Sequence, residues 1–121
     1  YGFLGHLNEM SSSSRLTAVV NFQEIEFIHG TKNFAKNDVI PGGTKKNFDY
    51  FKSNIKFHPN IKTYQKYMLS DAQTSGGLLI AVPDENIDVF MKELNKKTNY
   101  ISKVIGCFKP KEKKNIIVID E

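Results

Sequence analysis

The chain opens with a helical pattern of apolar residues, which is followed by a run of serines. Phe3, Leu7 and Met10 have the i, i+4, i+7 spacing of one helix face, and they predict a helix from Gly2 to about Met10. The four serines at 11–14 then predict a short linker that ends this helix.

Four segments have patterns that are typical of β-strands. Apolar side chains alternate with polar ones over residues 15–22, which predicts a strand with one buried face. Residues 78–82 form a continuous apolar run, and we expect a strand that is covered on both faces. Residues 100–108 and 115–119 are interpreted as two further strands.

Three more helices are expected between the first two strands. A short helix is predicted at 31–36. Thr44 follows a Pro-Gly-Gly turn and is predicted to be the N-cap of the next helix, and a His-Pro-Asn turn separates that helix from another at 61–69. The side chains expected to face inward from these two helices are Phe48, Phe51, Ile55, Tyr64, Tyr67 and Met68.

The last predicted helix has the clearest amphipathic pattern. Asp84 is expected to cap it, and Lys96 and Lys97 suit its negative C-terminal end. Its apolar stripe consists of Ile87, Phe90, Met91 and Leu94.

The order of these elements is helix, strand, helices, strand, helix, strand, strand. This order predicts an α/β fold, namely a two-layer α/β sandwich whose mixed sheet has helices packed on one face. With 121 residues, the chain is expected to form a single domain, residues 1–121. The chain begins at Tyr1 rather than at a methionine, and we interpret it as a piece of a longer protein.

Composition narrows the class of protein. The longest purely apolar run, residues 78–82, is far shorter than the ~20 residues that a membrane helix needs. One cysteine cannot form an internal disulfide framework or a multi-cysteine zinc site, and we expect a cytoplasmic protein.

The formal net charge of +4 raises the question of nucleic-acid binding. Of the 17 basic residues only Arg15 is an arginine, whereas reading of base edges favours arginine. Nucleic acid is therefore not the expected partner. A non-catalytic basic module that binds RNA or a protein stays open as an alternative.

The stretch from Asp71 to Gly77 has two interpretations. Its small residues can simply turn the chain sharply into the next strand. Alternatively, consecutive N–H groups in such a turn form an anion-binding nest, to which the hydroxyls of Thr74 and Ser75 add donors.

The stretch from Pro41 to Asn47 is similarly ambiguous. It lacks the spacing of a P-loop. Gly42 and Gly43 before a helix, with Lys45 and Lys46 in the first turn, could nevertheless attract phosphate. The other interpretation is a capped helix with solvated lysines.

Elsewhere the sequence offers no complete catalytic set. His6, His29 and His58 are dispersed and lack the spacing of a metal site. Cys107 has no neighbouring histidine or basic cluster, and we expect a buried, inert thiol.

Three motifs, taken together and in this order, are specific enough to indicate one protein family. They are YGFLGHLNEM (1–10), PGGTKKN (41–47) and DAQTSGGLLIAVP (71–83), and VIG at 104–106 fits as a closing strand. The chain resembles the C-terminal domain of the selenide, water dikinase (selenophosphate synthetase) family, which belongs to the aminoimidazole-ribonucleotide-synthetase-like superfamily. One departure is Ala72, where the family usually has proline.

The resemblance implies both a fold and a reaction. The fold would be like that of the C-terminal domain of aminoimidazole ribonucleotide synthetase. The full enzyme would be a phosphotransferase that makes selenophosphate, AMP and phosphate from selenide, ATP and water, and selenophosphate would feed selenocysteine synthesis. Its cofactors would be ATP and Mg²⁺, often with K⁺, none of them firmly bound by this chain. The parent would be a homodimer.

The resemblance also implies how the work is divided between domains. Catalytic residues would lie in the N-terminal domain, which is this chain's expected partner, and a magnesium-binding aspartate would precede Tyr1. This chain would form one wall of the ATP–Mg²⁺ cleft and be inactive alone. The expected cleft residues are Gly2, Gly5, Thr44, Asn47, Thr74, Ser75, Gly76 and Gly77. A related ATP enzyme of the same superfamily is a further alternative.

Overall fold

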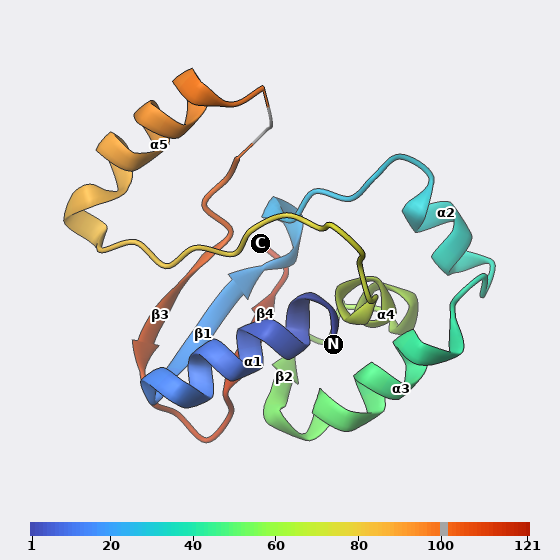
Figure 1. Ribbon diagram of the computed structural model, residues 1–121. Helices are drawn as coiled ribbons and strands as arrows, with labels where there is room; N and C mark the ends of the chain where they lie inside the picture. Colours follow the sequence, from blue (N-terminus) through green and yellow to red (C-terminus); the bar gives the residue numbers. More distant parts are fainter. Residues whose placement is uncertain (100–101) are drawn as a thin grey trace.

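The computed structural model describes residues 1–99 and 102–121 (Figure 1). The α-helices and strands are α1 (Gly2–Ser14), β1 (Leu16–Asn21), α2 (Thr31–Lys36), α3 (Gly42–Phe51), β2 (Ile55–Phe57), α4 (Thr63–Ser70), α5 (Ile87–Lys97), β3 (Gly106–Pro110) and β4 (Ile116–Ile119). Three short 3₁₀ turns are η1 (Phe22–Glu24), η2 (Lys52–Asn54) and η3 (Asp84–Asn86). The expected strand at 100–108 begins outside the described residues, and its described part is a strand only from Gly106.

The four strands form one mixed sheet in the order β2-β4-β1-β3. β4 runs parallel to both β1 and β2, whereas β3 runs antiparallel to β1. In Figure 1, α1 lies across the sheet, with α3 and α4 beside it. This arrangement confirms the predicted α/β fold with a mixed sheet.

The core lies between the sheet and helices α1, α3 and α4. Ile116 and Val118 are fully buried, and they alternate with the half-buried Ile117 and Ile119. Alternation of this kind shows that one face of β4 carries the core. The other members of the core are Leu4, Leu7, Ala18, Val20, Phe22, Phe51, Ile55, Ile61 and Leu69.

Helix α1 is longer than the sequence predicted, and its buried stripe is different. The serines at 11–14 continue the helix, so the predicted linker is wrong. Ser11 is fully buried, and its hydroxyl lies 2.6 Å from the carbonyl oxygens of Leu16 and Asn115. The buried face therefore follows Leu4, Leu7 and Ser11, while Phe3 and Met10 are only half-buried.

Helix α3 begins earlier and ends earlier than predicted. Its N-cap is Pro41, and Thr44 lies within the first turn rather than at the cap. Ile55 is not a helix residue, because it opens β2, a strand of three residues that the sequence pattern did not indicate. Helix α2 has the predicted bounds, and β1 and β4 lie within their predicted ranges.

The predicted buried strand at 78–82 is wrong. This segment has no strand assignment, and Leu78 and Ile80 are 89% and 48% exposed. Asp84 begins the 3₁₀ turn η3 rather than capping α5, whose N-cap is Asn86. The prediction that Cys107 is buried is also wrong, because Cys107 is exposed on β3, an edge strand of the sheet.

Gly106 is required by the close approach of β3 to β1. A Cβ atom at this position would overlap the carbonyl oxygen of Val19 and lie 2.8 Å from Cα of Val20. Gly106→Ala should therefore lower the free energy of unfolding by roughly 2 kcal/mol or more, which urea denaturation can measure.

The matched control for this substitution is Gly43→Ala, because nothing lies within 4 Å of a Cβ built on Gly43 in the first turn of α3. This control should unfold at the same urea concentration as the original chain or slightly higher, since alanine favours helix. Equal stability of the two variants would contradict the packing of β3 against β1.

Candidate functional site

The three motifs that the sequence analysis singled out meet at the end of α4. Gly2 begins α1 in the left-handed region, with φ of 69°. A Cβ on Gly2 would lie 2.6 Å from the carbonyl carbon and oxygen of Ser70 and 2.7 Å from the carbonyl oxygen of Asp71. Only glycine fits here, because a side chain would collide with the backbone of α4 and disfavour this φ.

The first two turns of α3 are bonded to the same two residues. Thr44 is 2% exposed, and its hydroxyl donates a hydrogen bond to Oδ1 of Asp71. One turn later, Nδ2 of Asn47 donates to the carbonyl oxygen of Ser70 at 3.1 Å. The starts of α1 and α3 are thereby both fixed to the C-terminal end of α4.

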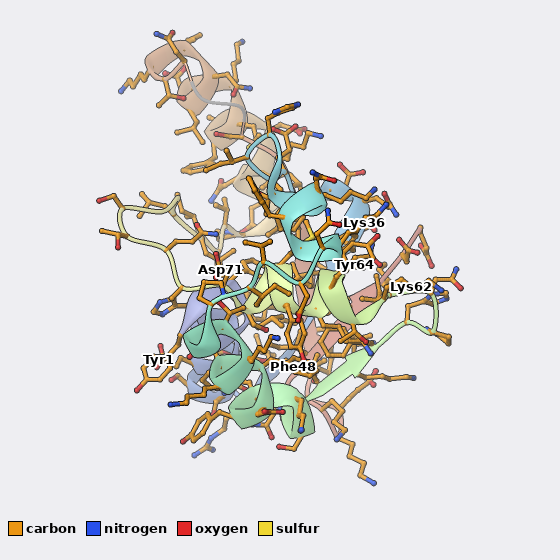
Figure 2. The ribbon with its side chains drawn as sticks, turned by 90° about the vertical axis from the view of Figure 1, so that its right-hand side faces the viewer. Tyr1, Lys36, Phe48, Lys62, Tyr64 and Asp71 are labelled. Carbon is orange, nitrogen blue, oxygen red and sulfur yellow. The ribbon has the colours of Figure 1, made fainter. Side chains whose placement is uncertain are left out.

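A cavity of about 690 Å³ opens beside this junction, between α2, α3 and α4. Its apolar lining includes Phe34, Ile40 and Tyr67, and its polar lining includes Thr44 and Asp71. In Figure 2, Asp71 lies beside the start of α3. The hydroxyl–carboxylate pair is therefore part of the wall of a concave surface, which is the usual setting of a ligand site.

Charged groups near the start of α3 and on the loop before it lie close to the cavity. Nζ of Lys45 is 2.9 Å from Oδ1 of Asp38, whose φ of 57° is left-handed. The hydrogen bond from this lysine to Asp38 raises the pKa of Lys45. Lys45 is thus already paired with a carboxylate, whereas Lys46 is exposed.

The other predicted cleft residues take no part in these bonds at the junction. Residues 72–77 leave the end of α4 as an exposed loop, in which Ser75 has φ of 57°. Gly77 has open space around it, and a Cβ on Gly76 would meet only the side chain of Gln73. Thr74 and Ser75 are both exposed.

Gly5 is buried inside the packing between α1 and α3. A Cβ on Gly5 would collide with Cβ of Tyr1 and lie 2.9 Å from the ring of Phe51. The rings of Tyr1 and Phe51 themselves pack edge to face with centroids 5.8 Å apart. Gly5 therefore lets the start of α1 approach Phe51.

Asp71 is a candidate site residue that the sequence analysis did not single out. It was considered only as the first residue of a turn, although it is the one acidic residue that directly precedes the Gly-rich stretch. Its partnership with Thr44 spans 27 positions of the chain, and nothing in the local pattern of either segment indicates it. Within residues 1–99 and 102–121, no group of three or more His, Cys, Asp or Glu side chains could hold a metal ion.

Lysines on the helical side of the molecule lie over aromatic rings. Nζ of Lys36 is 5.7 Å from the ring centroid of Tyr64, and these two residues are neighbours in Figure 2. Lys45 and Lys66 make similar contacts, with Tyr67 and Phe57. These contacts give several lysines a structural role and reduce the weight of charge alone as an argument for nucleic-acid binding.

Comparison with known proteins gives the same kind of match from a family model and from individual relatives. The family described as "AIR synthase related protein, C-terminal domain" matches residues 1–119. The chain is 39% identical over 118 residues to the selenide, water dikinase of Aliarcobacter butzleri, covering 98% of this chain and 34% of that protein.

Two further relatives have the same printed name. The protein of Haemophilus influenzae strain 86-028NP is 36% identical over 118 residues, and that of Clostridium botulinum strain Alaska E43 is 35% identical over 118 residues. Each match covers 98% of this chain, with 33% and 34% of the respective relative. The chain spans about a third of the length of the curated relatives it matches. No helix in the described residues is long and apolar enough to cross a membrane.

The bond between Thr44 and Asp71 can be tested by removing the hydroxyl. Thr44→Val keeps the shape of the buried side chain but leaves Asp71 without this donor, and it should lower the free energy of unfolding by about 1 kcal/mol. Thr44→Ser keeps a hydroxyl and should lose less. If urea denaturation gives Thr44→Val the stability of the original chain, the junction does not depend on this bond.

Proposed function

The chain belongs to the AIR synthase related C-terminal domain family, and we propose that it works as the C-terminal part of a selenide, water dikinase. In this proposal the complete enzyme converts selenide, ATP and water into selenophosphate, AMP and phosphate. The complete enzyme is cytoplasmic and homodimeric, and the remaining two thirds of its length are the direct partner of this chain.

The observation that supports this role best is that the three motifs meet at Asp71. Two of the three motifs contact Ser70 or Asp71, where the third motif begins. Gly2 packs closely against both residues, Thr44 donates a hydrogen bond to Asp71, and Asn47 donates one to Ser70. A cavity lies against the same junction. Three separated motifs joined at one concave surface are better explained by a shared site than by three independent turns.

Phosphoryl transfer requires positioning and charge stabilisation more than covalent chemistry from the protein. The start of α3 suits this role, because its first turn is exposed at Gly42 and Gly43 and its N–H groups favour an anion. The hydroxyls of Thr74 and Ser75 are exposed on the adjoining loop and are free to turn toward a bound phosphate. We therefore propose that this chain forms one wall of the ATP cleft.

Divalent metal fits this chain poorly. Two carboxylates line the cavity, and both are already engaged, because Asp71 accepts a hydrogen bond from Thr44 and Asp38 is paired with Lys45. Mg²⁺ prefers oxygen ligands from one or two carboxylates together with substrate phosphates. We therefore assign the metal to the remainder of the enzyme and derive no step through it here.

The contribution of the loop can be tested with Thr74→Val in the longer protein. If the hydroxyl donates to a phosphate oxygen, kcat/KM for ATP in selenide-dependent AMP formation should fall roughly tenfold, since a hydrogen bond to a charged group is lost. Thr63→Val is the matched control, because Thr63 is an exposed threonine at the start of α4, outside the three motifs. Unchanged kinetics of Thr74→Val would show that the loop is only a turn.

The division of work between the two parts gives a second test. The 121-residue chain should form no AMP from ATP and selenide, whereas the longer protein should do so under the same conditions. Fluorescence of an ATP analogue measures binding in the same samples. Selenide-dependent turnover by the chain alone would overturn the proposed division of work.

A further inference from the structure

Two exposed tyrosines pack against one buried phenylalanine ring. Tyr1 is 66% exposed and Tyr50 is 75% exposed, whereas Phe51 is only 6% exposed. The ring of Phe51 lies edge to face with the ring of Tyr1, at 5.8 Å between centroids, and with the ring of Tyr50, at 4.9 Å. In Figure 2, Tyr1 projects from the edge of the molecule. Tyr1, Tyr50 and Phe51 thus form an aromatic cluster with one member in the core and two at the surface.

The backbone around this cluster is closely fitted to it. A Cβ atom on Gly5 would collide with Cβ of Tyr1 and lie 2.9 Å from the ring of Phe51. Because Phe51 belongs to the core, the two exposed rings rest on a fixed base and lose little conformational freedom when a partner covers them. Tyrosines with an apolar body and an exposed polar tip are enriched at protein interfaces. The cluster therefore has the properties of a docking surface.

The cluster continues along α3 toward the proposed anion site. Gly43, Lys46 and Tyr50 follow each other at intervals of three and four residues, which places them on one face of α3. All three are exposed. A partner that covers Tyr50 and extends along this face would reach the N–H groups at the start of α3.

The place of Tyr1 in the longer protein indicates which partner this is. The matching family model describes a C-terminal domain, and the chain covers 34% of the selenide, water dikinase of Aliarcobacter butzleri. In the proposed enzyme, the other two thirds therefore precede Tyr1 and are joined to the cluster by the backbone itself. A part attached at such a short distance has a high effective concentration at the cluster, which favours it over any free partner.

We propose that Tyr1 and Tyr50 dock the part of the enzyme that precedes Tyr1, and that this contact holds that part along the exposed face of α3. The inference rests on the proposed function, because it takes this chain to be the C-terminal part of a longer enzyme. The docked surface offers apolar side chains to the two rings and hydrogen-bond acceptors to their hydroxyls. It then forms the opposite wall of the cleft at the start of α3.

Nitration of tyrosines by tetranitromethane, located by peptide mass spectrometry, tests whether Tyr50 is covered. In the 121-residue chain Tyr50 should react readily, because its side chain is exposed. In the longer protein, without ATP or selenide, its rate should fall roughly tenfold or more, since a docked ring reacts only when the contact opens. Tyr64 is the internal control, because it is half-buried on α4 beside Lys36 and should react equally fast in both proteins.

Substitutions in the longer protein show whether Tyr1 contributes to the same contact. Tyr1→Ser should raise the nitration rate of Tyr50 roughly threefold to tenfold, because loss of an interface tyrosine weakens docking. Tyr1→Phe keeps the ring and should leave most of the protection. Ile28→Ser is the control outside the cluster, because Ile28 is 87% exposed on the loop before α2, and it should leave the rate unchanged. Circular dichroism of each variant shows whether the fold is retained.

Three outcomes would overturn the inference. Tyr50 could react equally fast in both proteins, or Tyr64 could be slowed as much as Tyr50. Alternatively, the protection of Tyr50 could disappear when the longer protein is diluted, which would mean that a second copy covers the ring, since docking within one chain does not depend on concentration.

Selenide-dependent AMP formation, measured on the same samples, keeps this inference apart from the proposed function. An active longer protein with an unprotected Tyr50 would reject the docking surface alone. An inactive longer protein with a protected Tyr50 would reject the proposed reaction and support the docking surface.

Discussion

The sheet depends on β4, which is formed by almost the last residues of the chain and lies between β1 and β2. Both neighbours run parallel to it, so neither is joined to it by a tight hairpin. Ile116 and Val118 are completely buried at its centre. The centre of the sheet therefore joins β4 to two strands that come from much earlier in the sequence.

The turn before β4 also secures the first helix. Asn115 donates to Asn8 through its side chain and to Asn54 through its backbone N–H, while its carbonyl oxygen accepts hydrogen bonds from Ser11 and Ala18. Thr17, which is fully buried, adds a bond to the carbonyl oxygen of Lys114. These bonds fix α1 relative to the sheet, and with it the position of Gly2 at the far end of the helix.

The candidate site follows from this scaffold. Because α1 is held at its C-terminal end by the sheet, its N-terminal end meets the end of α4, where Gly2 permits contact with Ser70 and Asp71. Helix α3 is bonded to the same two residues through Thr44 and Asn47. By contrast, the segment from 78 to α5 is covered only in part. Leu79 packs against the core, whereas Leu78 and Ile80 are exposed and no residue of α5 is fully buried.

The sequence by itself determined the elements whose pattern is local. The alternation of residues 15–22 and the apolar stretch at 115–119 lie over β1 and β4, and the short helix at 31–36 has the predicted bounds, because period and turn residues are properties of neighbouring positions. The three motifs were also visible in the sequence. The residue types of the three motifs indicated which groups could bind a ligand, but they did not indicate that the motifs contact one another.

Only the tertiary structure decided the features that depend on distant partners. Ser11 continues a helix because its hydroxyl reaches the carbonyl oxygen of Asn115, and the three residues of β2 form a strand because β4 pairs with them. Residues 78–82 have no strand paired with them and form no strand despite their pattern, although Leu79 packs against the core. Asp71 became part of the site only when folding brought Thr44 to it, since a hydrogen bond across 27 positions leaves no trace in local sequence.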